Sequence, residues 1–284
     1  MVAFRPAKAV TSVSPQPLPE YDRPPVSEVV FSVEFVPPSN WRSAHAGCYW
    51  STIKREYPIA QDAPALQSQI ERFDGGQASV SIPQIQILSP GDARWWFVSS
   101  GGNHLIQIQR DRFITNWRKE RDGDSYPRYV TGLRPRFVKE MTQFREFLHD
   151  NNLTPLTLRQ CEISYINFIV RGTDWDSFSD AVELFSFISD KGSDGYLPPP
   201  ESLAIAGSFR VPDEEARLHF NITRAIRQSD QQEGIQIMLT ARGRPQSDSD
   251  ADILRFMDLG REWIVRGFTD LTSKKAHLLW GRTQ

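Results

Sequence analysis

The feature that most constrains the fold of this chain is the alternation of apolar and polar residues over positions 104–118. Its two halves are separated only by Arg110-Asp111, a pair that suits a two-residue hairpin turn. Pairing across this turn places Ile108 opposite Phe113. Because successive side chains of a strand point to opposite faces, one face of the hairpin is apolar and the other is mostly polar. The sequence therefore predicts an antiparallel sheet that is buried mainly on one side.

The same kinds of pattern define the other elements. Apolar residues alternate from Val29 to Phe35 and predict a strand, which ends before Pro37-Pro38. Apolar residues spaced three or four apart predict amphipathic helices. The expected strands are residues 28–35, 79–88, 94–100, 104–109, 112–118, 161–170, 203–211, 217–227 and 234–242, and the expected helices are residues 43–57, 135–152, 175–189 and 250–267.

The order of these elements repeats along the chain. Residues 28–155 correspond to β-α-β4-α and residues 156–284 to β-α-β3-α. At an offset of 134 positions several residues also coincide, such as Trp41 with Trp175. The alternative is that such strand-to-helix junctions recur by chance, because Asn and Asp cap helices well. We therefore predict an α+β protein of two tandem repeats, with antiparallel sheets covered by helices on one face, as in the saddle of TATA-box-binding proteins.

The start of the chain and its cysteines bear on its location. Residues 1–27 contain six prolines and no apolar signal-peptide core, so we expect an extended arm. The longest apolar stretches are strand-sized and fall short of the ~20 residues that cross a bilayer, so no membrane partner is expected. Only Cys48 and Cys161 are present, without the spacing of a disulfide framework or a zinc site. These features favour a reducing, cytoplasmic location.

Polar residues on the exposed strand faces are the candidate binding residues. Residues 110–140 contain nine basic and five acidic side chains with aromatic residues between them, which suits contact with a nucleic-acid backbone. The alternative is a solvated face whose arginines pair with Glu28 and Glu34 on a neighbouring strand. The candidates are Gln107, Gln109, Arg112, Asn116 and Arg118 in the first repeat and His219, Asn221, Gln236 and Arg242 in the second.

No catalytic or metal-binding motif is evident. Asp248, Asp250 and Asp252 have the opening spacing of a calcium loop but lack its glycine and its final glutamate, so they are expected to begin a helix instead. The five histidines include no pair at helical spacing, and no nucleophile elbow is present. We therefore expect no catalytic residue, no metal and no cofactor.

Several phrases carry a family resemblance. Residues 105–118 read LIQIQRDRFITNWR and residues 261–272 read REWIVRGFTDLT. Together with Tyr126-Pro127-Arg128-Tyr129 and Gln160-Cys161-Glu162, they resemble a sporadically distributed prokaryotic family of uncharacterised proteins of about this length. The resemblance covers nearly the whole chain from Pro24 and carries over no catalytic residue. Patchy distribution of this kind is frequent in defence and toxin–antitoxin loci, which is what the resemblance implies here.

These observations rank three functions. The net charge of −2 gives no global indication of nucleic-acid or membrane binding. The leading hypothesis is a non-catalytic interaction module with a protein partner, in a defence or toxin–antitoxin-type system. One alternative is a nucleic-acid-binding protein that uses the polar sheet faces. The other is an enzyme or small-ligand-binding protein whose site is formed by residues distant in the sequence.

Overall fold

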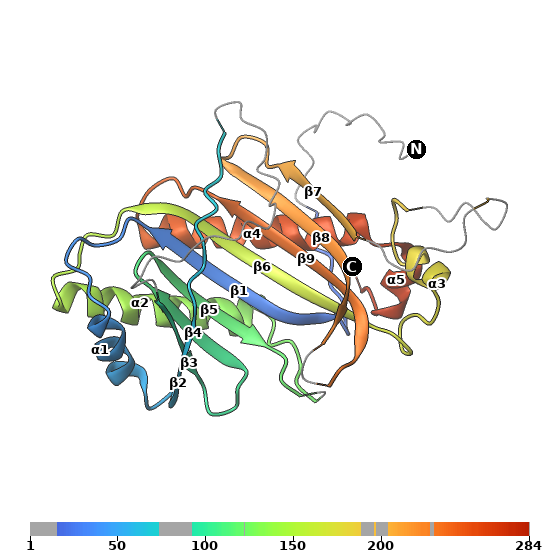
Figure 1. The fold of residues 1–284 in the computed structure, drawn as a ribbon. Helices are drawn as coiled ribbons and strands as arrows, with labels where there is room; N and C mark the ends of the chain where they lie inside the picture. Colours follow the sequence, from blue (N-terminus) through green and yellow to red (C-terminus); the bar gives the residue numbers. More distant parts are fainter. Residues whose placement is uncertain are drawn as a thin grey trace.

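The computed structural model describes residues 16–73, 93–121, 123–188, 196, 204–227 and 230–283. The strand expected at residues 79–88 lies outside these ranges. Within them the protein has an α+β fold, in which nine strands form a single antiparallel sheet (Figure 1). The strands follow the order β2-β3-β4-β5-β1-β6-β9-β8-β7 across the sheet.

The elements alternate along the chain much as the sequence predicts. The first half contains β1 (Val26–Phe35), α1 (Ala44–Ile53), β2 (Ile59–Pro64), β3 (Ala93–Val98), β4 (His104–Gln109), β5 (Arg112–Arg118), the π-helical turn η1 (Tyr129–Leu133) and α2 (Arg134–Asp150). The second half contains β6 (Leu158–Val170), α3 (Phe178–Glu183), β7 (Ala204–Arg210), β8 (Ala216–Ile226), β9 (Glu233–Gly243), α4 (Asp250–Leu271) and α5 (Lys274–Leu279).

The predicted hairpin forms with the predicted register, because Ile108 lies opposite Phe113. Its apolar side faces the long helices α2 and α4, which lie behind the sheet in Figure 1. The ring of Phe113 stacks on that of Phe144 in α2, with 4.6 Å between the ring centroids. This face of the sheet is therefore the hydrophobic core, and the other face carries the polar side chains.

The two sheets expected from the repeats are one sheet. β1 pairs with β6 at the centre, where Val30 lies opposite Ser164. Outward from β1 the strands are β5, β4, β3 and β2, and outward from β6 they are β9, β8 and β7. The expectation of one sheet for each half is therefore wrong. The first strands of the two halves, β1 and β6, pair with each other along most of their length.

Other differences concern short or exposed elements. In the described part of the range 175–189, the expected helix is reduced to α3. This helix begins after Ser177, whose hydroxyl accepts a hydrogen bond from the backbone N–H of Asp180. β2 was not predicted because it is an exposed edge strand without apolar alternation. α5 is only six residues long, too short for a helical period to be recognised.

The described part of the N-terminal segment packs against the body of the protein. Tyr21 is buried, and its hydroxyl hydrogen-bonds the Thr269 hydroxyl at 2.9 Å. Its ring meets that of Phe268 edge to face. Residues 16–25 are therefore attached to the end of α4 rather than extended away from the domain.

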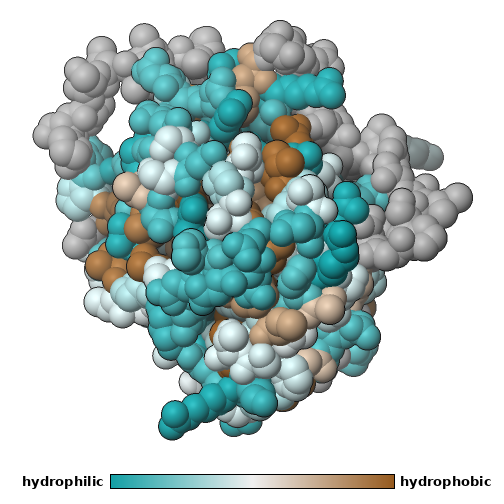
Figure 2. Space-filling view, turned by 90° about the vertical axis from the view of Figure 1, so that its left-hand side faces the viewer, coloured by the Kyte–Doolittle hydropathy of each residue, from teal (hydrophilic) through white to brown (hydrophobic). Residues whose placement is uncertain are grey.

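Hydrophobic residues do not gather into one broad patch on the side of the molecule drawn in Figure 2. That surface is mostly hydrophilic, with hydrophobic residues in small, separate areas (Figure 2). Large exposed apolar patches usually mark docking surfaces. The described residues on this side therefore form no broad apolar docking surface.

Gly260 allows α4 to pack closely on the sheet. An added Cβ would lie 2.5 Å from Cγ2 of Ile163 and 3.0 Å from Cβ of Ala241. We expect Gly260→Ala to lower the free energy of unfolding by about 1–3 kcal/mol, because overpacking outweighs the helical preference of alanine. Urea denaturation measures this change.

The matched control is Gly47→Ala in α1, where an added Cβ would meet nothing within 4 Å. It should raise the free energy of unfolding by roughly 1 kcal/mol through helix propensity alone. Equal effects of the two substitutions would contradict the close packing of α4 on β6 and β9.

Candidate functional site

The structure places all nine candidate binding residues on the same face of the sheet. Strand pairing aligns Asn116, Val30, Ser164, Thr240 and His219 in one row across five neighbouring strands. We call this face, opposite α2 and α4, the polar face. The parallel rows hold the other candidates, which are Gln107, Gln109, Arg112, Arg118, Asn221, Gln236 and Arg242.

Carboxylates neutralise the charged candidates in the first half. Arg112 forms an ion pair with Glu34 at 2.5 Å, and Arg118 pairs with Glu120. Asn116 donates a hydrogen bond to Glu28 at 2.5 Å. Arg112 thus pairs with Glu34 on the neighbouring strand β1, as the alternative interpretation expected. Glu28, the other expected partner, binds Asn116 rather than an arginine. Acidic and basic side chains are therefore mixed on this half of the polar face, and its surface is not uniformly basic.

The candidates in the second half differ in burial. Arg242 forms an ion pair with Glu162 of the neighbouring strand β6. His219 is partly buried and hydrogen-bonds Glu71. Asn221 is exposed, and Gln236 is partly buried. The structure therefore brings His219 and Arg242 into one cluster and leaves Asn221 and Gln236 outside it.

Residues 65–73 cross the polar face, which was expected to be open. This stretch, here called the crossing segment, follows β2 and passes over the strands in front of the sheet (Figure 1). Contacts begin at Gln109 on β4 and continue to Arg217 on β8. The prediction of an open face is wrong along this line, because the segment carries polar groups that match those of the strands beneath it.

Two buried glutamines bind the backbone of the crossing segment. Gln109 accepts a hydrogen bond from the Leu66 N–H at 2.8 Å and donates one to the Leu66 carbonyl at 2.9 Å. Gln160 accepts from the Glu71 N–H at 3.2 Å and donates to the Gln69 carbonyl at 3.0 Å. Each amide thus satisfies one backbone donor and one backbone acceptor. Such bonds recognise an extended chain whatever its side chains are.

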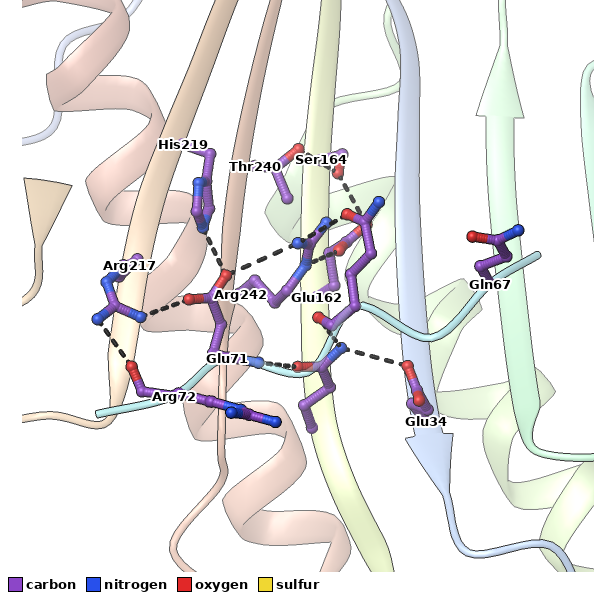
Figure 3. A network of polar contacts seen from close by, with 12 residues as sticks. Glu34, Gln67, Glu71, Arg72, Glu162, Ser164, Arg217, His219, Thr240 and Arg242 are labelled. Carbon is purple, nitrogen blue, oxygen red and sulfur yellow. Dashed lines mark hydrogen bonds and ion pairs between the residues drawn. The ribbon is translucent and has the colours of Figure 1, made fainter. Parts of the chain in front are cut away.

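The carboxylate of Glu71 lies among three basic groups (Figure 3). Arg217 donates to it at 2.5 Å, His219 Nε2 donates at 2.6 Å, and Arg242 lies 3.7 Å away. Burial raises the pKa of Glu71, but the hydrogen bonds and charges of these groups outweigh burial and lower it. Glu71 is thus held as a carboxylate.

The strand register explains why this position needs an anion. Arg217 and Arg242 lie directly opposite each other on β8 and β9, where two like charges repel. Glu71 reaches Arg217, whose side chain is only 9% exposed, and Glu162 reaches Arg242. The ring of Phe73 lies beneath the Arg217 guanidinium, 4.6 Å from its centre. The two acids offset a repulsion that the strand pairing itself creates.

Sequence reasoning missed the crossing segment and its partners Gln160 and Arg217. One signal was available, because Gln67, Gln69 and Glu71 alternate as the polar residues of an extended chain do. Its larger apolar residues, Leu66, Ile70 and Phe73, do not alternate as those of a half-buried strand do, so the pattern predicts no strand here.

Glu140 is a buried acid that could suggest an active site. It is 2% exposed, and it contacts the Tyr57 hydroxyl and Arg136 on the core side of the sheet. Burial raises its pKa to about 7, although Arg136 and the Tyr57 hydroxyl act in the opposite direction. A substrate cannot reach a carboxyl covered in this way, so we interpret the cluster as structural.

Changing Glu71 to Gln should loosen the crossing segment, since Arg217 would keep its buried charge without a counter-charge. We expect the backbone amides of Leu66 and residue 71 to exchange hydrogen about tenfold faster or more, which corresponds to ~1.4 kcal/mol of local stability. Hydrogen exchange measured by NMR tests this. The matched control is Glu120→Gln, which removes the charge of a partly exposed ion pair that does not contact the crossing segment. Unchanged exchange in Glu71→Gln would contradict the role of the carboxylate.

The raised pKa of Glu140 predicts a pH-dependent stability. The ordinary pKa of a glutamate is 4.5. Between pH 4.5 and about 7, Glu140 therefore keeps its proton in the folded protein and loses it in the unfolded chain. Stability should therefore fall as pH rises through this window, by up to about 3 kcal/mol. Urea denaturation of wild type and Glu140→Gln at several pH values measures it. Parallel pH curves for the two proteins would show that Glu140 titrates normally.

Comparisons with protein-family models, curated proteins and solved structures find no match to this chain. Among the residues that the structure describes, no group of three or more His, Cys, Asp or Glu side chains could hold a metal ion. Within the same ranges, no helix is both long and apolar enough to cross a membrane. The function is therefore argued from the geometry of the polar face itself.

Proposed function

We propose that this protein is a non-catalytic interaction module whose polar face binds an extended, acidic segment of a protein partner. The observation that carries the proposal is the pair of buried amides, Gln109 and Gln160, each bound to a backbone N–H and a backbone carbonyl of the crossing segment. In this interpretation the crossing segment occupies the place that a partner segment would take.

The contacts divide into a general and a specific part. The glutamine amides and the bond from Arg217 to the Arg72 carbonyl, at 2.8 Å, hold the main chain. Main-chain bonds give affinity, and pockets for single side chains give specificity. The specific part is the cluster of Arg217, His219 and Arg242, which suits one carboxylate. The expected partner sequence is therefore an extended stretch with Glu or Asp at one position.

The nucleic-acid alternative is less well supported by the charges on this face. Glu28, Glu34 and Glu162 lie among the basic residues and would repel phosphates. Arg112 and Arg242 are already paired with two of these acids. Binding to nucleic acid would require several of these pairs to break. The enzyme alternative has no accessible catalytic cluster among the described residues to support it.

We also propose that the two halves are tandem copies in a saddle-like arrangement. Ser164 follows Val30 by 134 positions, the offset at which the two halves of the sequence coincide, so these paired residues are each other's counterparts. Such self-pairing is expected when a twofold axis passes between two copies. The strand orders outward from β1 and β6 support the same view, with β2 as the additional strand of the first copy.

The setting of the interaction is proposed from the sequence. The patchy family distribution favours a partner within a defence or toxin–antitoxin-type system. Two free cysteines, one buried and one exposed, favour the cytoplasm.

A peptide with the sequence of residues 64–73 tests the proposed function. For this test, a full-length variant is made with the substitutions Gln69→Ser and Glu71→Ser. They weaken the binding of its own crossing segment to the polar face. We expect fluorescence anisotropy to show saturable binding to this variant and binding at least about tenfold weaker to wild type, whose own segment competes.

Two matched reagents sharpen this experiment. The same peptide with Gln at the Glu71 position should bind the variant about tenfold more weakly, because it lacks the charge-assisted bonds. Arg217→Gln, added to the variant, should remove that difference. Absence of saturable binding, or equal binding of both peptides, would refute the proposal. Strong, salt-sensitive binding of oligonucleotides instead would favour the nucleic-acid alternative.

A further inference from the structure

A cavity of about 410 Å³ lies on the helix-covered side of the sheet. Its walls are the start of β1, part of β6, the η1 turn and α4, and residues 19–21 and 24 of the N-terminal segment border it. This volume falls within the roughly 300–1,000 Å³ typical of small-molecule sites. Because Tyr165 and Asn167 of β6 line it, the cavity faces away from the crossing segment. It is a separate site, and its interpretation is independent of the proposed function.

Arg261 brings a positive charge to this cavity. Its guanidinium lies over the ring of Tyr129, 4.9 Å from the centroid, and its buried Nε has no hydrogen-bond partner. Asp258, one turn earlier on α4, is already bound by Arg134 at 2.9 and 3.0 Å and by the Tyr129 hydroxyl at 2.7 Å. Among the residues that the structure describes, no carboxylate forms an ion pair with Arg261. A partly buried cation in this situation is stabilised by an anionic ligand.

Arg128 adds a second guanidinium to the lining. Its backbone has φ of 54°, a region that residues other than glycine rarely adopt. Its Nη1 donates to the Tyr21 carbonyl at 3.0 Å, which directs the side chain toward the cavity. Strained backbone and π-helical turns such as η1 are concentrated at functional sites. Glu20, also in the lining, is exposed and forms no ion pair with either arginine.

Tyrosine hydroxyls supply a further hydrogen-bond donor. The hydroxyls of Tyr126 and Tyr165 are bonded to each other at 3.0 Å. Burial raises the pKa of both, so both stay protonated. One hydroxyl donates to the other, and the proton of the second is left to donate to a ligand. Arg128, Arg261 and one tyrosine hydroxyl therefore offer donors to the cavity, while Ile264 and Phe268 provide an apolar wall.

We propose that this cavity binds a small organic anion. Its acidic group would lie between Arg261 and Arg128, within reach of the tyrosine hydroxyls, and its apolar or aromatic body would pack against Val26, Ile264 and Phe268. Carboxylate and phosphate share this chemistry, since guanidinium groups bind both through paired N–H donors.

The fluorescent probe 1-anilinonaphthalene-8-sulfonate combines an acidic group with an aromatic body, and N-phenyl-1-naphthylamine is its uncharged counterpart. We expect the sulfonate to bind one saturable site on the folded full-length protein. Arg261→Gln should weaken the sulfonate about tenfold and leave the uncharged probe unchanged. Competition by benzoate and by phenyl phosphate then shows which acidic group the site prefers.

The matched control is Arg255→Gln, on the same helix but paired with Glu214 and absent from the lining. It should change neither affinity. A second variant, Val265→Trp, fills the cavity and should abolish binding of both probes, with near-ultraviolet circular dichroism reporting the folded state. The proposal fails if wild type shows no saturable sulfonate binding, or if Arg261→Gln and Arg255→Gln bind the sulfonate alike.

Discussion

The pairing of β1 with β6 is the interaction on which the rest of the structure depends. It joins strands that are more than a hundred positions apart and makes one sheet out of two sets of strands. On the core side it brings Phe31 opposite Ile163 and Val33 opposite Cys161, all of them buried. On the polar side it places Glu34 beside Gln160. Both the core and the polar face are thus centred on the same pair of strands.

Burial of charge on the polar face follows from this arrangement. A nine-stranded sheet with two long helices on one side leaves the other side to water or to another segment. Arg217 and Glu71 are nearly removed from solvent, which is tolerated only because each meets opposite charge and hydrogen-bond partners. The crossing segment is therefore an integral part of the structure, and any partner that replaces it must supply equivalent groups.

Much of the fold could be predicted from local patterns. The hairpin register and the strands β1, β8 and β9 follow from alternation, β6 follows from a strand-sized apolar stretch, and α2 and α4 follow from helical spacing. The single sheet could not be predicted in the same way, since it depends on pairing between segments distant in the sequence. The helix expected at residues 175–189 is shorter for a related reason, because Phe185 and Phe187 contact distant elements, at Thr272 and Phe220, instead of continuing the helix.

The site was predictable only in part. Alternation correctly assigned Gln109, Arg112, His219 and Arg242 to one side of their strands. It gave no information on what covers them, because Glu71 reaches His219 from nearly 150 positions away. The cavity beside Arg261 was invisible for the same reason, since its walls come from four separate parts of the chain.

If the polar face binds a partner segment as proposed, the crossing segment also determines how selective this face is. It is attached directly to β2, so its effective concentration at the face is on the order of millimolar. A segment of another protein present at micromolar concentration must bind more tightly in proportion, or contact strands beyond those that residues 65–73 reach. Under the proposed function, the covalent connection would set an affinity threshold that excludes weakly binding acidic sequences resembling the protein's own.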